Sequence, residues 1–318
     1  MKKGMVIIME ITASMVKELR EMSGAGMMDC KKALAATNGN MDEAVDFLRK
    51  SGAMKAEKKA SRIAAEGLCK VLVDGNTAVV VEVNSETDFV AKNEKFLEFV
   101  NDVANQALKS NATDMDAFMA ENWLADTTKT VNEALIEKVA VIGEKLSIRR
   151  FEKVVAENGC VVTYTHGGGR IGVIVEAETD VVNDAVKEAL SNIAMQIAAL
   201  NPKFISSADV DQEYIAHEKE IILEQIKNDP KESAKPEKVI EGMVQGRINK
   251  ELKDVCLLEQ VYVKAEDGKQ QVKAYIDQVA KANNAKLSIK KMVRFETGEG
   301  IEKKQENFAE EVAAQMNK

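Results

Sequence analysis

The apolar residues of the chain change their spacing near residue 66. Before it, within residues 10–50, they recur every three or four positions in three short segments, which predicts three helices. From Glu66 onward, dense β-branched runs predict strands. The runs at 68–73 and 77–83 flank Asp74-Gly75-Asn76, a pattern typical of a β-hairpin. A helical module therefore precedes a region of mixed structure.

The second half of the chain repeats this strand plan. Runs at 160–165 and 170–175 flank three glycines, Gly167 to Gly169, and a segment with helical spacing follows them. The later run at 286–296 corresponds to the earlier one at 145–152. We expect an α+β fold with two related α+β subdomains, each a small antiparallel sheet with helices on one face.

An insertion interrupts the second repeat. Two stripes of apolar residues lie within 208–252, separated by a segment that contains Pro230 and Pro236. Proline breaks helices, so the pattern predicts an antiparallel, coiled-coil-like helical hairpin. A short amphipathic C-terminal helix is expected from about Asn307, either docked on its own fold or contacting a partner.

A basic segment, residues 49–62, follows the third predicted helix and is most simply a solvated linker, partly helical. It lacks the interleaved aromatic residues that would favour nucleic-acid contact. The domain boundaries that we expect are 10–62 for the helical domain and linker, 63–155 for the first subdomain, 156–207 and 253–297 for the second, 208–252 for the hairpin and 298–318 for a C-terminal module.

Composition and charge argue against several classes of function. The chain has 318 residues and a net charge of −8, which argues against non-specific binding to nucleic acid or to an anionic membrane. No apolar run approaches the roughly 18 residues of a membrane span. The four cysteines form no C-x-x-C pair, as expected of reduced thiols in a cytoplasmic protein.

Residues 1–8 are expected to be an alternative start or an appendage, because Met9 looks like a natural first residue.

The motifs of common enzyme sites are incomplete. Gly167, Gly169 and Gly172 satisfy G-x-G-x-x-G, but a strand rather than a helix is predicted after them, so we reject a dinucleotide site. No G-x-x-x-x-G-K-[ST] sequence is present, so the chain is not expected to bind nucleotide directly. Ile221 replaces the second histidine of a zinc-protease motif that begins at His217. We therefore predict no catalytic residues, metal or cofactor.

Two short segments have alternative interpretations. In Thr87-Asp88-Phe89-Val90, between a predicted strand and a predicted helix, Asp88 either caps the helix while Phe89 packs on its first turn, or both side chains point out of the fold. Met27 and Met28, at the start of the second predicted helix, either fill a core or contact a partner.

Four motifs resemble the bacterial elongation factor Ts family. They are S-G-A-G-M-M-D-C-K-K-A-L from Ser23, T-D-F-V-A-K-N-E-K-F from Thr87, H-G-G-G-R-I-G from His166 and R-F-E-T-G-E-G-I-E-K-K from Arg294. The resemblance runs from Met9 to about Met316, and the three-helix segment also resembles ubiquitin-associated (UBA) modules. Ser23 stands in place of the usual threonine, and the turn after His166 is richer in glycine than the family pattern.

The resemblance implies a guanine-nucleotide exchange factor without covalent chemistry, whose partner is elongation factor Tu. In that family the T-D-F-V segment enters a groove on the partner's nucleotide-binding domain. Phe89 would act there as a wedge beside the Mg²⁺ site, supported by Thr87, Asp88 and Val90, and would disturb Mg²⁺ and phosphate binding. Met27 and Met28 would hold the same domain from another side. His166 would contact a neighbouring domain of the partner.

A second function class is an interaction protein, an adaptor or chaperone built from a UBA-like module on an α+β scaffold. Such a protein would bind its partner without accelerating GDP release. The second repeat has Val181 where the first has Phe89, which suggests that Phe89 serves a purpose outside its own fold. An enzyme is the weakest interpretation, because no catalytic set is present.

Overall fold

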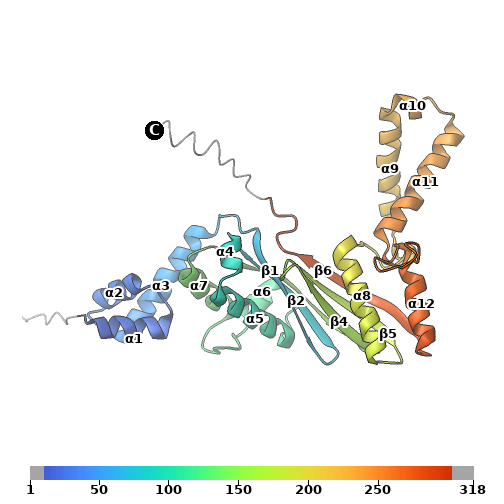
Figure 1. Ribbon diagram of the computed structural model, residues 1–318. Helices are drawn as coiled ribbons and strands as arrows, with labels where there is room; N and C mark the ends of the chain where they lie inside the picture. The colour runs from blue at the N-terminus through green and yellow to red at the C-terminus, as the bar shows by residue number, and fades with distance from the viewer. Residues whose placement is uncertain (1–10, 303–318) are drawn as a thin grey trace, which may run out of the picture. The chain divides into compact units, whose positions relative to one another are not determined.

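The computed structural model of the protein describes residues 11–302 (Figure 1). The chain divides into two compact units, and the boundaries between them run through the strands. Of the described residues, unit 1 contains 11–70, Val81–Phe151 and 296–302, and unit 2 contains Val71–Val80 and Glu152–Phe295.

The N-terminal part of unit 1 is a module of three packed helices, α1 (Ala13–Ser23), α2 (Met27–Ala36) and α3 (Met41–Lys59). Its small core consists of Val16, Leu19, Cys30, Ala33, Leu34 and Ala44. The hydroxyl oxygen of Thr12 caps α1 by accepting from the Met15 amide, which satisfies one of the free N–H groups at a helix start. The three predicted helices are thus confirmed.

Helix α3 is longer than the sequence pattern indicated. The third predicted helix was expected to end before the basic segment 49–62, with Gly52 beyond its end, but Gly52 lies inside α3, which continues to Lys59. Gly52 is buried, and a β-carbon at this position would lie 3.3 Å from the β-carbon of Ala140. Because glycine has no side chain, α3 can approach helix α7 (Val131–Ile142) closely. Most of the expected linker is therefore the second half of a helix that packs on α7 within unit 1.

The first sheet has the strand order β1 (Glu66–Asp74), β2 (Thr77–Ser85) and β3 (Leu146–Val155). The central strand β2 is buried along nearly all of its length. Between β2 and β3 the chain forms α4 (Asp88–Ala91), α5 (Glu94–Lys109), α6 (Met115–Ala120) and α7. The buried face of α5 includes Phe96 and Phe99, and α5 packs against α7.

The second sheet, in unit 2, has the order β4 (Gly159–His166), β5 (Ile171–Thr179) and β6 (Leu287–Glu296). Strands β4 and β5 are antiparallel, with Gly159 opposite Glu178 and His166 opposite Ile171. Helix α8 (Asp184–Leu200) covers β4 and β5, and α12 (Val272–Ala282) packs on α8. Two small sheets with helices and an N-terminal helical module confirm the predicted α+β class.

The insertion in unit 2 is a helical hairpin, as predicted. Helices α9 (Gln212–Asn228) and α11 (Glu237–Val255) lie side by side (Figure 1). Short helices occur at its tip, α10 (Pro230–Ser233), and beside its base, η1 (Ser207–Asp209) and η2 (Leu257–Glu259). Its own buried cluster is Ile222, Ile226, Val244 and Ile248. The predicted C-terminal helix lies outside the described residues.

Candidate functional site

The T-D-F-V segment forms a one-turn helix, α4, between β2 and α5. The hydroxyl oxygen of Thr87 accepts a hydrogen bond from the Val90 amide at 3.3 Å, so Thr87 is the N-cap of this turn. Asp88 therefore caps neither this turn nor the longer helix α5 that follows it, so its interpretation as a cap is wrong. Asn93 then caps α5 through the Lys95 amide at 3.0 Å.

Phe89 projects from α4 into solvent. It is 81% exposed, whereas Phe96, one helix further along, is fully buried. A ring that packed on the first turn of its own helix would be covered, so the interpretation of Phe89 as a hydrophobic staple is wrong. The sequence pattern alone did not decide between these two possibilities.

Asp88 is exposed next to Phe89 and pairs with Lys92, one turn later, at 2.7 Å. The hydrogen bond from Lys92 lowers the pKa of Asp88, so its carboxylate is ionised at neutral pH. Both side chains reach solvent, and a partner can compete for either of them.

A carboxylate from the α7–β3 connection holds the start of α4. Glu144 Oε2 accepts from the Glu86 amide at 3.1 Å and from the Thr87 amide at 3.0 Å. Its other oxygen, Oε1, accepts from the Thr87 hydroxyl at 2.7 Å. In return, Glu86 Oε1 accepts from the Lys145 amide at 2.5 Å. Sequence reasoning missed Glu144, because these partners lie 57 and 58 residues away and follow no local spacing.

Met27 and Met28 form the first turn of α2 and are 58% and 64% exposed. The core of the three-helix module is formed by other residues. The core-filling interpretation of the two methionines is therefore wrong. Their flexible, polarisable side chains are suited to an adaptable contact surface.

His166 is exposed at the end of β4. Its Nδ1 lies 3.1 Å from the Tyr164 hydroxyl oxygen. Gly167, Gly168 and Gly169 follow with φ angles of 58°, 65° and 102°, which a residue with a side chain rarely adopts. They form a hairpin turn into β5 rather than the start of a helix, in agreement with the rejection of a dinucleotide site.

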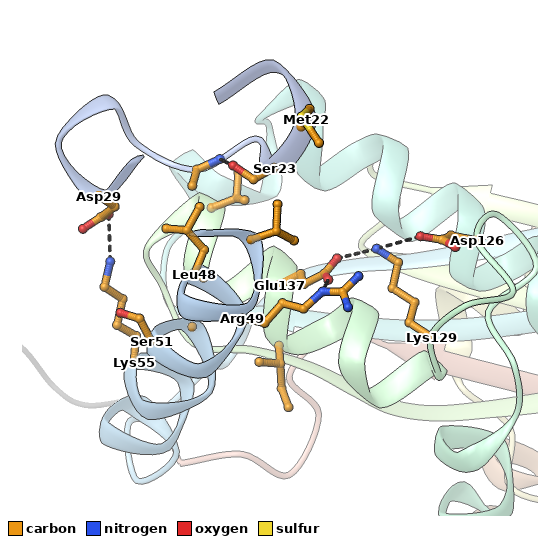
Figure 2. A pocket seen from close by; sticks show the side chains of 16 residues that line it. Met22, Ser23, Asp29, Leu48, Arg49, Ser51, Lys55, Asp126, Lys129 and Glu137 are labelled. Carbon is orange, nitrogen blue, oxygen red and sulfur yellow. Dashed lines mark hydrogen bonds and ion pairs between the residues drawn. The ribbon is translucent and has the colours of Figure 1, made fainter. Parts of the chain in front are cut away.

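A small cavity lies where α3 packs on α7 (Figure 2). Its volume is about 170 Å³, below the roughly 300 Å³ at which ligand pockets begin. Ion pairs border it: Lys129 contacts Asp126 at 3.2 Å and Glu137 at 2.5 Å, and Arg49 lies 3.7 Å from Glu137 (Figure 2). We interpret the cavity as part of the packing between these helices and not as a nucleotide site.

The predicted site residues occupy three separate elements within residues 11–302. Thr87 to Val90 lie at α4 and the two methionines on α2, both in unit 1, whereas His166 lies in unit 2. Over the same residues, no group of three or more histidine, cysteine, aspartate or glutamate side chains could hold a metal ion. Nor does any helix there have the length and apolarity to span a membrane.

The architecture defines an α+β protein with an N-terminal helical domain of the UBA/TS-N type, and that domain description matches residues 11–48. The family described as Elongation factor TS matches residues 86–299. The chain therefore belongs to the elongation factor Ts family, a family of translation elongation factors.

Relatives named Elongation factor Ts match almost the whole chain. The protein of Clostridioides difficile (strain 630) is 54% identical over 308 residues, which cover 96% of this chain and 99% of the relative. The proteins of Clostridium novyi (strain NT) and Clostridium tetani (strain Massachusetts / E88) are 49% and 46% identical, again over 96% of this chain and 99% of each relative.

Proposed function

We propose that this protein is a cytoplasmic guanine-nucleotide exchange factor that binds elongation factor Tu–GDP. It promotes GDP release and GTP loading during translation elongation by disturbing the Mg²⁺ and phosphate site of its partner. Family membership supports this proposal, and the exposed ring of Phe89 is the observation that carries it.

Phe89 has the properties that a wedge requires. Its side chain is accessible without rearrangement, because 81% of the residue is exposed. The turn that carries it is held by the Thr87 cap and by bonds to Glu144, so little flexibility is lost on binding. A single aromatic residue in a well-packed interface pocket can contribute about 2 kcal/mol or more to binding, which is the range of a hot-spot residue. In this proposal, the ring of Phe89 inserts beside the Mg²⁺ site of the partner.

The neighbouring residues are assigned supporting roles. Asp88 is ionised and exposed beside the ring, where it can accept hydrogen bonds from the partner. Thr87 and Val90 set the direction of the turn. Met27 and Met28, exposed on α2, are proposed to contact the partner's nucleotide-binding domain at another point, and His166 is proposed to contact a neighbouring domain.

Exchange by this route needs no bond to be made or broken. Suppose that a protein binds nucleotide-free elongation factor Tu more tightly than the GDP-bound form. It must then lower the affinity of elongation factor Tu for GDP by the same ratio, because the coupling between two sites is reciprocal. Contacts remote from the nucleotide, such as those of the methionines, supply binding free energy that stabilises the nucleotide-poor conformation.

Stopped-flow release of fluorescent GDP from elongation factor Tu tests the assignment. We expect this protein to accelerate release, and Phe89→Ala to slow the accelerated rate by about ten- to a hundredfold, which is about 1.4 to 2.7 kcal/mol. Truncation of a buried phenylalanine would cost about 3–5 kcal/mol of stability, but Phe89 is exposed, so its variant should melt close to the parent.

Val181→Ala is the matched control, because Val181 occupies the corresponding junction of the second repeat and should affect release less. If the parent binds elongation factor Tu without accelerating release, the protein is an adaptor and the proposal fails. If Phe89→Ala melts far below the parent while its folded fraction retains the parental rate, the wedge assignment is wrong.

A further inference from the structure

We propose that Glu144 is a positioning residue for exchange, which acts by fixing the turn that carries Phe89. This inference rests on the proposed exchange function and adds a residue that the T-D-F-V motif does not contain. Glu144 lies in the connection between α7 and β3, whereas Phe89 lies in α4, so the two belong to segments far apart in the chain.

Helix α4 cannot be expected to hold its own shape. It contains four residues, and a helix that short is unstable without outside support, because nucleation fixes many dihedral angles for few hydrogen bonds. Its start is instead ordered by three hydrogen bonds to one carboxylate, two from the main-chain amides of Glu86 and Thr87 and one from the Thr87 hydroxyl. Bonds to an ionised acceptor are stronger than neutral ones.

The hydroxyl of Thr87 links the carboxylate to the helix cap. A threonine hydroxyl has one proton to donate, and here that proton goes to Glu144 Oε1 at 2.7 Å. The oxygen keeps its lone pairs for the Val90 amide at 3.3 Å, which is the capping bond. Glu144 therefore fixes the side-chain rotamer that caps α4, and through it the direction in which Phe89 leaves the chain.

The second repeat provides a comparison within the same molecule. In both repeats a residue with positive φ follows the helix, Gly143 at 88° directly after α7 and Asn284 at 50° two residues after the end of α12, and it stands two positions before the lysine that precedes the returning strand. The amide of that lysine donates to a carboxylate at the junction in each case, Lys145 to Glu86 and Lys286 to Asp180, at 2.5 and 2.7 Å. Because this hydrogen bond from the lysine amide occurs in both repeats, we interpret it as part of their common fold.

Glu144 has no counterpart in the second repeat. The equivalent position, between Asn284 and Lys286, is Ala285. That repeat also has no short helix between β5 and α8, and its junction, residues 180–183, contains no aromatic residue. The carboxylate occurs together with the exposed aromatic ring and is absent where the ring is absent. A role in presenting Phe89 accounts for this difference, whereas a role in the common fold does not.

The first measurement needs no partner. We expect Glu144→Ala to increase the hydrogen-exchange rate of the Val90 to Lys92 amides by about tenfold or more, since the cap loses its fixed rotamer. Glu133→Ala is the matched control, because Glu133 supports the Thr130 cap of α7 through the same kind of bonds. It should leave the amides of α4 unchanged. Unchanged α4 amides in Glu144→Ala would overturn the inference.

The second measurement is GDP release in a double-mutant cycle. We expect Glu144→Ala to slow catalysed release by about fivefold in the parent and by less than about twofold in a Phe89→Ala background, because the effect passes through the ring. Glu144→Gln keeps an oxygen acceptor for the two amides and should restore part of the rate. An equal loss in both backgrounds would mean that Glu144 contacts the partner itself, and would contradict the positioning role.

The two measurements test the two proposals independently. If the parent protein does not accelerate GDP release, the proposed function is wrong, while the amide rates still decide whether Glu144 orders α4. Thermal melting of each variant, compared with Glu133→Ala, shows whether a loss of rate reflects unfolding of the whole molecule or the loss of order in α4 alone.

Discussion

Glu82 is a fully buried charge in the middle of β2. Its Oε1 accepts from the Gly298 amide at 2.8 Å, from Asn84 at 3.0 Å and from Arg149 at 3.0 Å, and its Oε2 accepts from Arg150 at 2.6 Å. Burying a carboxylate is unfavourable unless it is paired and hydrogen-bonded, and here it is both. Gly298, in the R-F-E-T-G-E-G-I motif, is thereby tied to the first sheet within unit 1.

The ionisation of Glu82 makes stability depend on pH. Burial alone would raise the pKa of Glu82, but the hydrogen bonds from Gly298, Asn84 and the two arginines outweigh it, so the pKa lies below its ordinary value of 4.5. A group whose pKa is lowered by folding stabilises the protein above its unfolded pKa. That stabilisation is lost as the pH falls through the folded pKa.

We predict that Glu82→Gln lowers the free energy of unfolding at pH 7 by about 3 kcal/mol, because the arginines lose their buried counter-charge. The deficit should begin to shrink as the pH falls below 4.5, where the unfolded chain starts to take up the proton, and should shrink further as the pH falls through the lowered pKa of folded Glu82. Urea unfolding at several pH values measures both effects, with the exposed Glu57→Gln as the control. A deficit of equal size at pH 3 and pH 7 would contradict this account.

At the residue scale, sequence reasoning found the exposed positions but not their supports. Phe89, Met27 and His166 were identified because motifs and the contrast with Val181 drew attention to them. The expected cap, Asp88, is not a cap: Thr87 caps α4 and Asn93 caps α5, and spacing does not separate three residues that are all good caps. Glu144 was not identifiable, because hydrogen bonds across 57 residues leave no periodic signal.

At the scale of elements, periodicity predicted the strands, the hairpin turns and the inserted helical pair. It placed the end of α3 too early, because a glycine after an apolar run usually marks a helix end. Here Gly52 is an interior helical residue that faces Ala140 of α7. The reason is tertiary packing, which a local pattern does not contain.

Gly52→Leu tests the packing of α3 on α7. Even a β-carbon at position 52 would lie 3.3 Å from that of Ala140, so a leucine side chain cannot fit unless the helices separate. We predict a loss of about 1–3 kcal/mol in the free energy of unfolding, although leucine favours helix more than glycine does. Urea unfolding measures it. The control is Ala53→Leu at the exposed neighbouring position, expected within about 0.5 kcal/mol of the parent; equal stabilities of the two variants would show that α3 does not pack as described.

At the scale of the whole molecule, the two related sheets were predictable because the second half of the chain repeats the strand plan of the first. The N-terminal helical module was predictable from the helical spacing of its apolar residues. The domain boundaries stay a prediction. The compact units divide the chain within β1 and β2, at residues 70 and 81, where no change of composition marks a boundary.

The central claim is that this protein binds nucleotide-free elongation factor Tu better than the GDP-bound form. Isothermal titration calorimetry of the protein against both forms, at a fixed Mg²⁺ concentration, measures this coupling directly. We predict affinities for the two forms that differ by about 5- to 150-fold. The affinity of elongation factor Tu for GDP should fall by the same ratio when this protein is bound. Equal affinities for the two forms would contradict the account, because a protein that does not distinguish them cannot displace the nucleotide.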